Sequence, residues 1–416
     1  MTAETRSERK QIRHCMVVHN CYPFDEIRVQ REAKALVDSG VDVDVICLQR
    51  EREPLTERVD SVNIYRLPIR RDRRRRSRGA QLLEYVAGFC LTFILLTALH
   101  LKRRYDVVQI HNLPDFLVFA ALIPRLMGSK LILDIHDLMP EFYCSRFKGS
   151  FDSVPVRLVR LQEWLACRFV HHVITVTEPW RRTLIGRGVS AAKCSVVMNI
   201  ADVQYFGTAL ARRHRRDNGG YRLIYHGSMT YRYGVDLALR ALDRVRHDIP
   251  DVHLSVHGRG DYVDQFRNLI KELALDDFVS LDTTVLSLPE LNEAIASADV
   301  GLVPYRSDGF TDWILPTKLM EYVAVNVPVI AARTPGISAY FDGDMVEFFT
   351  AGNVDELADR IRHLHRDRNR RGALAKNARA FHDRYNWPDQ ARDYVRRVTV
   401  MASTDRPSPR HPANTR

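Results

Sequence analysis

Residues 14–48 read HCMVVHNCYPFDEIRVQREAKALVDSGVDVDVICL, with one apolar run at each end. The runs at 14–19 and 41–48 are short and rich in β-branched residues, which is typical of buried strands. Between them, over about 26–39, apolar residues recur every three or four positions, and Gly40 follows where a helix would end. This order predicts two parallel strands joined by a crossover helix.

The same alternation continues along the chain, which predicts an α/β fold with doubly wound parallel sheets. The further strands are expected at 106–111, 130–136, 173–177, 222–226, 252–257, 299–303 and 327–332, and the further helices at 154–169, 234–247, 261–274, 288–298, 317–325, 354–366 and 388–401.

The alternation lapses once, in a polar and basic stretch that ends in two glycines, which divides the chain into two Rossmann-like domains facing each other across a cleft. The predicted parts are a flexible N-terminus at 1–12, an N-terminal domain at 13–206, a linker at 207–220, a C-terminal domain at 221–384, a last helix at 385–401 and a disordered tail at 402–416.

Composition limits the possible partners and the compartment. The 416 residues carry 62 Lys+Arg against 51 Asp+Glu, an excess of +11 that suits nucleic acid, anionic lipid or a phosphorylated substrate. The seven cysteines are odd in number and contain no CxxC pair, which favours reduced thiols in the cytoplasm. The charged N-terminal residues 1–13 predict no secretory signal peptide.

One segment, Tyr85–Leu101, is apolar over its whole length, and eight arginines lie within Arg66–Arg78 before it. Three interpretations stay open for it. It is a buried helix after a solvated basic loop, a monotopic helix whose arginines meet anionic headgroups, or a membrane span of marginal length. The second makes the protein peripheral on the inner face of the cell membrane.

The second domain carries glycines at the ends of two successive strands. Gly227 and Ser228 follow the strand at 222–226, and Gly258 and Gly260 follow the strand at 252–257. Glycine there lets the backbone approach a ligand closely and directs N–H groups at phosphate oxygens.

A third signal in this domain is the helix that begins after Pro316. Its first turn offers unpaired N–H groups, and Thr317 and Lys318 stand at that end, where a diphosphate would bind. Glu321 lies one turn further on the same face, where its carboxylate would accept hydrogen bonds from a ribose diol.

Together these stretches resemble glycosyltransferase family 4, whose members are retaining nucleotide-sugar glycosyltransferases with the GT-B fold. The resemblance covers nearly the whole chain. It is carried by HNLPDFL at 111–117, DIHDLMPE at 134–141, VMNIADVQYF at 197–206, YHGSMTYRYGVDLAL at 225–239, HGRGD at 257–261, SADVGLVPY at 297–305 and TDWILPTKLMEYVAVNVPVIA at 311–331.

The resemblance implies a role for each matched position. Glu321 would bind the ribose of the donor, with Thr317 near its diphosphate. His136 would be the active-site histidine, with Asp137 beside it as a second catalytic candidate. The candidates on the acceptor side are Glu141, His111, Asn112 and, in the loop after the first strand, Asp25 and Arg28.

Two positions depart from the family pattern. The first acid of the family's glutamate pair is replaced by Trp313, with Asp312 one place away. The family's arginine after the first strand of the second domain is replaced by Ser228, which leaves Arg232 as the cation to stabilise the leaving diphosphate.

The implied reaction transfers a sugar from a nucleotide diphosphate sugar to an acceptor hydroxyl with retention, on a lipid-linked or cell-envelope polysaccharide precursor. The resemblance also implies no metal and no cofactor, and a last helix that returns to the first domain. Asp134, His136 and Asp137 are compatible with a metal cluster, but closely spaced acids at a strand end are common. Nucleic acid is not an expected partner.

Two alternatives remain at this stage: a sugar-nucleotide 2-epimerase of the same architecture, which needs paired carboxylates, and a non-catalytic membrane-associated partner subunit.

Overall fold

The computed structural model describes residues 11–23, 26–70, 78–147, 150–201, 206 and 220–403. Several sequence-based predictions therefore lie outside the described residues: Asp25, the N-terminus at 1–10, the basic stretch at 71–77, the linker at 207–219 and the tail at 404–416.

The chain divides into two units, and each is described by itself. The first unit comprises Met1–Met198 together with Pro388–Arg416, and the second comprises Asn199–Trp387. The division thus falls at Met198, before the predicted boundary at 206, and the last helix belongs to the first unit.

The first unit is built on an eight-stranded sheet in the order β3-β4-β2-β1-β5-β6-β7-β8. Every pairing is parallel except that of β3 with β4. The strand order reverses between β1 and β5, where a doubly wound sheet binds its ligands. The strands are β1 (Arg13–Cys21), β2 (Asp42–Gln49), β3 (Thr56–Val59), β4 (Val62–Arg70), β5 (Val107–His111), β6 (Lys130–Ile135), β7 (His172–Thr175) and β8 (Cys194–Val196).

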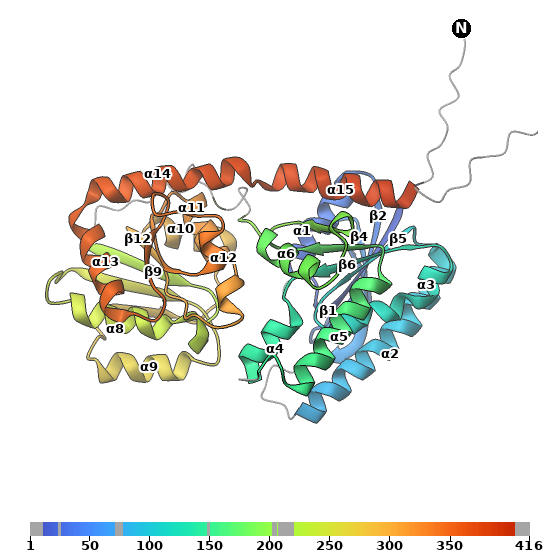
Figure 1. Cartoon of the computed structure of the whole chain (residues 1–416), viewed down its shortest axis with the longest axis horizontal. Helices are drawn as coiled ribbons and strands as arrows, with labels where there is room; N and C mark the ends of the chain where they lie inside the picture. Colours follow the sequence, from blue (N-terminus) through green and yellow to red (C-terminus); the bar gives the residue numbers. More distant parts are fainter. Residues whose placement is uncertain are drawn as a thin grey trace, which may run out of the picture. The chain divides into compact units, whose positions relative to one another are not determined.

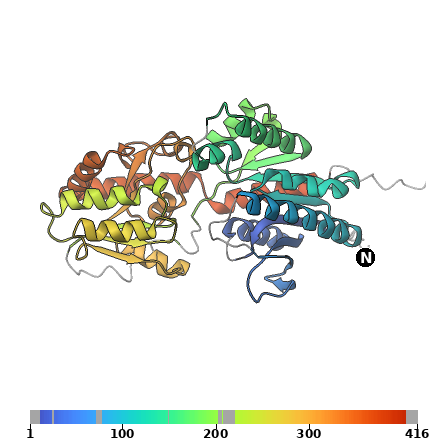
Figure 2. The ribbon, with the colours of Figure 1, turned by 90° about the horizontal axis from the view of Figure 1, so that it is seen from below.

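Helices cover both faces of this sheet, with α1 and α15 on one face and α2 and α5 on the other (Figure 1). Figure 2 views the unit from the side of α2. The helices are α1 (Ile27–Asp38), α2 (Arg78–Arg103), α3 (Leu122–Leu126), α4 (Met139–Phe147), α5 (Val154–Phe169), α6 (Glu178–Gly186) and α15 (Trp387–Ser403), with short 3-10 turns η1 (Asp115–Ala121) and η2 (Ala191–Lys193).

The second unit is built on a six-stranded parallel sheet in the order β11-β10-β9-β12-β13-β14, which reverses between β9 and β12. Its strands are β9 (Tyr221–His226), β10 (Val252–His257), β11 (Val279–Asp282), β12 (Val300–Val303), β13 (Val329–Arg333) and β14 (Glu347–Thr350). Its helices are η3 (Tyr231–Tyr233), α8 (Val235–Val245), α9 (Val263–Glu272), α10 (Leu288–Ala296), η4 (Thr311–Trp313), α11 (Thr317–Ala324), α12 (Pro335–Ser338), α13 (Val354–Arg366) and α14 (Arg368–Arg384).

The doubly wound α/β class predicted from the sequence is confirmed. The sequence analysis missed the strands β3, β4, β8, β11 and β14 and the helices α3, α4, α6, α12 and α14. The missed strands β3, β8, β11 and β14 lie at sheet edges and have only three or four residues, too few to show a period. The helix α14 (RNRRGALAKNARAFHDR) is too polar to show an apolar stripe. The structure corrects the interpretation of Arg66 as part of a solvated basic loop. Arg66 lies in β4, is 3% exposed, and pairs with Glu53 and Glu57 at 3.0 and 2.8 Å.

A buried hydrogen bond attaches α15 to the sheet of the first unit. The Tyr394 hydroxyl donates to Gln109 Oε1 at 2.7 Å, and Gln109 Nε2 donates to Glu32 Oε2 on α1 at 2.7 Å. All three side chains are buried, so these bonds hold both helices on one face of β5.

We predict that Tyr394→Phe lowers the free energy of unfolding by about 1–2 kcal/mol, because it leaves the buried Gln109 carbonyl without its donor. Urea denaturation measures the change. Tyr231→Phe, at an exposed position, is the matched control and should change it by less than about 0.5 kcal/mol. Equal effects of the two substitutions would show that the bond to Gln109 contributes nothing specific.

Candidate functional site

The centre of the first unit's site is Asp134, at the carboxyl end of β6. Arg28, in the first turn of α1, donates from Nε to Asp134 Oδ2 at 2.8 Å and from Nη2 to Oδ1 at 2.9 Å. Arg28 also donates from Nη1 to the carbonyl of Val197 at 2.7 Å. Both charged side chains are buried, and a bidentate guanidinium–carboxylate pair is the geometry that holds such charges most rigidly.

Two histidines share the same carboxylate oxygen. His111 Nδ1 lies 3.1 Å from Asp134 Oδ2, and His136 Nε2 lies 3.0 Å from it. The two ring nitrogens are 3.3 Å apart. Burial alone would raise the pKa of Asp134, but the Arg28 charge, followed by His136 and His111, outweighs it and holds that pKa well below its ordinary value. Asp134 is therefore ionised at neutral pH and accepts hydrogen bonds from both imidazoles.

Asn112 holds the loop that carries His136. Its Oδ1 accepts from the His136 amide at 2.7 Å, and its Nδ2 donates to the Asp137 carbonyl at 2.7 Å. It also donates to Asp115 Oδ1 at 3.0 Å. Burial raises the pKa of Asp115 to about 7, and Glu163 adds to the rise. The geometry makes Asn112 a positioning residue for His136 and Asp137.

Glu141 and Arg28, both predicted to meet the acceptor, are held in buried ion pairs. Arg187 on the loop after α6 bridges Glu141 on α4 and Glu163 on α5, donating from Nη1 to Glu163 Oε1 at 2.9 Å and from Nη2 to Glu141. Arg187 was not noticed in the sequence, where nothing distinguishes it from the many surface arginines. Of the three side chains that contact Asp134, which are Arg28, His111 and His136, that of His136 is the most exposed, at 16%.

His111, Asp134 and His136 also form a group whose ligand atoms could hold a metal ion. Imidazole nitrogens and a carboxylate suit a divalent transition metal. However, the Arg28 guanidinium already lies on both oxygens of Asp134, so a cation bound there would meet a fixed positive charge. The donor set fits a hydrogen-bonded cluster better than it fits a metal centre.

The site of the second unit lies where β9 ends and α11 begins. Gly227, with a φ of +99°, turns the chain after β9. A Cβ at this position would lie 3.4 Å from Lys318 Cε and 3.6 Å from its Nζ. The lysine ammonium therefore lies next to the Gly227 backbone. The helix itself starts after Pro316, which makes no side-chain cap.

Lys318 is buried among aromatic rings. Its Nζ lies 3.8 Å from the ring centroid of Tyr225, with the rings of Tyr305 and Tyr233 at 5.4 and 5.6 Å. Among the described residues no hydrogen-bond acceptor contacts this Nζ. Burial lowers the pKa of Lys318 to about 7, although Glu321 acts in the opposite direction. Such an ammonium is stabilised by an incoming anion.

Glu321 lies on the same side of α11, one turn along. Its Oε2 is 3.2 Å from His226 Nε2 at the end of β9. Burial raises the pKa of Glu321 to about 7, and the Lys318 charge opposes the rise. Burial, together with Lys318 and His257, holds the pKa of His226 well below its ordinary value. His226 is thus neutral, and its Nε2 lies close to the carboxylate without a hydrogen bond to it. The sequence analysis quoted this histidine beside Gly227 but gave it no role.

The two further glycines pack against the Gly227 loop. A Cβ on Gly258 would lie 2.0 Å from the Gly227 carbonyl oxygen, and one on Gly260 would lie 1.9 Å from that of Met229. These glycines therefore permit close contact of two loops, and this contact shapes the turn at Gly227. Ser228 and Thr317 are exposed beside it.

No contact of Arg232 with Lys318 or Glu321 is found among the described residues. Its guanidinium stands 5.5 Å from the Phe310 ring centroid. The neighbouring Arg306, which the sequence analysis did not single out, pairs with Asp236 through two bonds of 2.8 and 2.7 Å and donates to the Tyr231 carbonyl at 2.6 Å. Arg306 therefore fixes the loop on which Arg232 stands.

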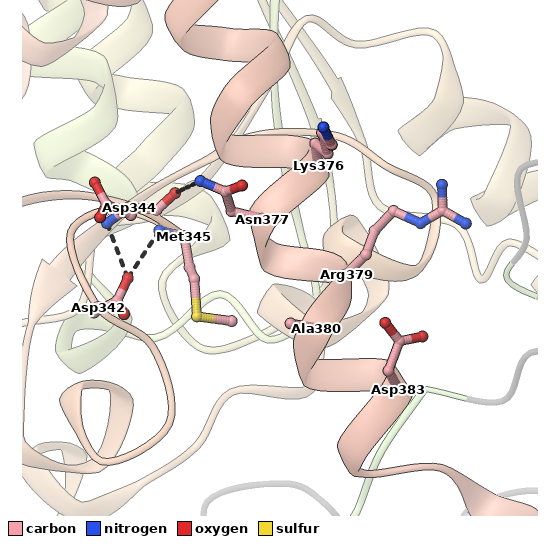
Figure 3. A pocket seen from close by; sticks show the side chains of 8 residues that line it. All are labelled: Asp342, Asp344, Met345, Lys376, Asn377, Arg379, Ala380 and Asp383. Atoms are coloured by element: carbon pink, nitrogen blue, oxygen red, sulfur yellow. Dashed lines mark hydrogen bonds between the residues drawn. The ribbon is translucent and has the colours of Figure 1, made fainter.

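A cavity of about 600 Å³ lies elsewhere in this unit, between α14 and the turn before β14 (Figure 3). Asn377 donates to the Asp344 carbonyl at 3.1 Å across it. None of the predicted site residues lines this cavity, which is bounded by Asp342, Asp344, Met345, Lys376, Asn377, Arg379, Ala380 and Asp383.

Comparison with known families identifies both halves of the chain. Residues 26–199 match the model described as a glycosyl transferase 4-like domain, and residues 220–367 match the model described as glycosyl transferases group 1. The chain belongs to the family 4-like glycosyltransferases. The family is one of sugar-transferring enzymes.

Individual relatives are distant. The chain is 26% identical to the sulfoquinovosyl transferase SQD2 of Arabidopsis thaliana, over 69% of this chain and 55% of that protein. It is 23% identical to the chitobiosyldiphosphodolichol beta-mannosyltransferase of Candida albicans, over 76% of this chain and 72% of that protein. The chain therefore spans about half of the length of the first relative and nearly three quarters of the second.

Solved structures show the same fold. Sucrose-phosphate synthase from Thermosynechococcus elongatus superposes with a TM-score of 0.74 at 17% identity, covering 94% of this chain and 99% of that chain. The Anabaena protein HepE in complex with UDP-glucose gives a TM-score of 0.70 at 16% identity, covering 94% and 100%. The GT-B fold expected from the sequence is thus confirmed.

We predict that Arg28→Met lowers the free energy of unfolding by about 3–5 kcal/mol, because it leaves the Asp134 charge buried without its partner. Chemical denaturation at pH 7 measures the loss. Lys34→Met, on the same helix but in an exposed pair with Asp38, is the matched control, with an expected loss below about 1 kcal/mol.

The pH dependence of this loss has a definite sign. A carboxyl whose pKa is lowered by folding stabilises the fold above its unfolded value of about 4, and this contribution is lost as the pH falls. In Arg28→Met, burial without the guanidinium raises the pKa of Asp134 above its unfolded value, so the variant regains stability as the pH falls from 7 to 4. The wild type keeps its contribution over this range, and the difference between the two proteins should therefore shrink. A difference that does not change between pH 7 and pH 4 would contradict the assignment of the loss to this charge.

Proposed function

We propose that this chain is a retaining glycosyltransferase that uses a nucleotide diphosphate sugar and transfers the sugar to a hydroxyl of a lipid-linked or cell-envelope acceptor. The observation that carries the proposal is the Lys318 ammonium, which is buried without a hydrogen-bond acceptor among the described residues, next to Gly227 and one turn from Glu321. The cation would meet the diphosphate of a nucleotide, and the carboxylate, one helical turn away, would meet its ribose.

The donor's diphosphate would lie against Gly227 and the uncapped first turn of α11. There the helix N–H groups and Lys318 would neutralise it together. Lys318 thereby takes the place of the basic residue that the family has where this chain has Ser228. Glu321, which lies beside the neutral His226, would accept hydrogen bonds from the ribose hydroxyls. A solved structure of HepE from Anabaena contains UDP-glucose, which supports a donor of this class.

The proposed transfer proceeds with the acceptor on the side of the leaving group. The bond from the sugar's anomeric carbon to the phosphate oxygen breaks as the acceptor oxygen forms its bond to the same carbon. The acceptor's proton passes to the departing diphosphate. The chain contributes charge stabilisation of the diphosphate and, through His136, a hydrogen-bonding group held by Asp134 and Asn112. This role does not require a metal, which agrees with the Arg28 guanidinium on Asp134.

The acceptor class is proposed from the relatives. The Candida albicans protein is named for a diphosphodolichol acceptor. A Mycolicibacterium smegmatis protein, 28% identical over 43% of this chain and 48% of that protein, is named for a phosphatidylinositol monomannoside. Both names describe sugars carried on lipids. We therefore propose a lipid-linked sugar as the acceptor of the present chain.

The experiment that tests the function is a panel of nucleotide sugars, each offered with and without membrane lipid extract. Transfer of label to extractable lipid that depends on the enzyme is the expected result. Change of the sugar in the absence of any acceptor would instead indicate the 2-epimerase. Slow hydrolysis alone, with every donor and extract, would contradict the proposed acceptor class.

We predict that Glu321→Ala weakens binding of the preferred nucleoside diphosphate about 10- to 100-fold, because it removes a charged hydrogen-bond acceptor for the ribose. Lys318→Met should weaken binding of the nucleoside diphosphate to a similar extent but leave binding of the free nucleoside unchanged. Calorimetric titration with both ligands separates the two roles. Loss of nucleoside binding in Lys318→Met would contradict the diphosphate assignment.

We also predict that His136→Ala lowers kcat about 10²- to 10⁴-fold and leaves the dissociation constant for the donor unchanged, because His136 belongs to the other unit's site. His14→Ala serves as the control for removal of a histidine from the interior of the same sheet. A fall in donor affinity equal to the fall in kcat would argue against a role for His136 in transfer.

A further inference from the structure

The outer face of α2 is apolar along its whole described length. Its exposed residues recur at helical spacing and form one stripe: Leu83, Val86, Cys90, Ile94, Ala98 and Leu101. Leu83 is 70% exposed and Ile94 is 63% exposed. By length and composition α2 is also apolar enough to cross a membrane, with 22% of its apolar window buried. A monomeric soluble protein seldom exposes such a stripe without a use for it.

The inner face of α2 is packed on the sheet. Leu96 is fully buried, and Thr92 and His100 are buried on the same side. Gly88 lies so close to β1 that a Cβ there would be 2.5 Å from His19 Cε1. The helix is therefore a layer of the domain, so a membrane that meets it would contact the outer stripe only.

Two further helices extend this apolar surface. On α5 the residues Val154, Leu158, Leu161 and Leu165 form one stripe, each more than 40% exposed, with Trp164 beside it. On and after α3, Leu126 is 73% exposed and Met127 is 39% exposed. The turn η1 contacts both α2 and α5, and α3 contacts both α2 and η1. We call the exposed sides of α2, α3 and α5 the docking face.

On these three helices the basic and the acidic side chains differ in exposure. The exposed ones are basic: Lys102 on α2, Arg125 on α3, and Arg157, Arg160 and Arg168 on α5. The acids on the described parts of these helices are turned inward: Glu84 lies 3.7 Å from His19, and Glu163 pairs with Arg187. An apolar surface with a rim of arginines and a tryptophan matches the interface of an anionic bilayer.

We propose that the docking face binds the first unit flat onto an anionic lipid bilayer, with the stripes of α2 and α5 in the acyl boundary and the basic side chains on the headgroups. Charge favours this occupant over a second copy of the chain, since two copies meeting on this face would bring their arginines together. The proposal adds α3 and α5 to the segment that the sequence singled out, and it does not depend on which sugar is transferred.

The test measures co-sedimentation of the whole chain with vesicles of phosphatidylglycerol and phosphatidylcholine, without donor or acceptor. Leu158→Glu/Leu161→Glu, at exposed positions, should weaken binding about tenfold or more. Val285→Glu, an equally exposed apolar position in the second unit, should leave it unchanged. Circular dichroism and urea denaturation confirm that each variant is folded.

A second pair of variants tests the charge. Arg157→Gln/Arg160→Gln should weaken binding to anionic vesicles and reduce its salt dependence, whereas Arg240→Gln/Arg267→Gln, exposed in the second unit, should not. Unchanged vesicle binding by the leucine variant would overturn the proposal. So would a wild type that sediments as a dimer, ignores vesicles and becomes monomeric in the leucine variant. Because no sugar is present, either outcome leaves the proposed transferase function to its own test.

Discussion

The buried ion pair between Arg28 and Asp134 is the constraint on which the first unit's site depends. It joins the first turn of α1 to the end of β6 and, through Val197, to the segment after β8. Once the carboxylate is ionised by this partner, it can accept hydrogen bonds from His111 and His136. The imidazoles are thus oriented by a charge that water does not reach, which is how a site keeps its geometry while a substrate enters and leaves.

The Arg28–Asp134 pair is linked to the C-terminal helix α15 through a series of polar contacts. Arg28 lies 3.2 Å from Glu32, which accepts from Gln109, which in turn accepts from Tyr394. A chain of polar contacts therefore runs from α15 through the middle of the sheet to the His136 loop. Buried networks of this kind are stable only when every member has a partner, so α15 belongs to the architecture of the site although it is far from it in sequence.

The second unit follows a different physical logic. Its cation, Lys318, is surrounded by tyrosine rings and has no hydrogen-bond acceptor among the described residues. Its pKa is accordingly low. In the first unit the protein satisfies its buried charge itself, whereas in the second the missing acceptor is what the proposed diphosphate would supply. Under the proposed function, the first site is organised before its ligand binds, whereas the second site is completed by the diphosphate.

Sequence pattern was sufficient for the residues that lie next to a strand end or a helix start. Lys318 and Glu321 were singled out in this way, because they stand at a helix start, whereas His136 and Asn112 became candidates through the resemblance to the family. It was insufficient for residues that act through a partner distant in the chain. Arg28 was expected on the acceptor side but is buried against Asp134, and nothing in the sequence distinguished Arg187 or Arg306 from other arginines.

By itself, the sequence determined the alternation of strands and helices, the two doubly wound units and the types of side chain at the sheet edges, because these depend on local periodicity and on chain connectivity. Only the tertiary structure decided which charges are paired and which are not, and which apolar residues stay exposed. The sequence left the exposure of the apolar segment in α2 open among three interpretations, and it predicted α5 only as a helix. Both stripes stay exposed because, in the described part of the chain, their outer sides are left uncovered.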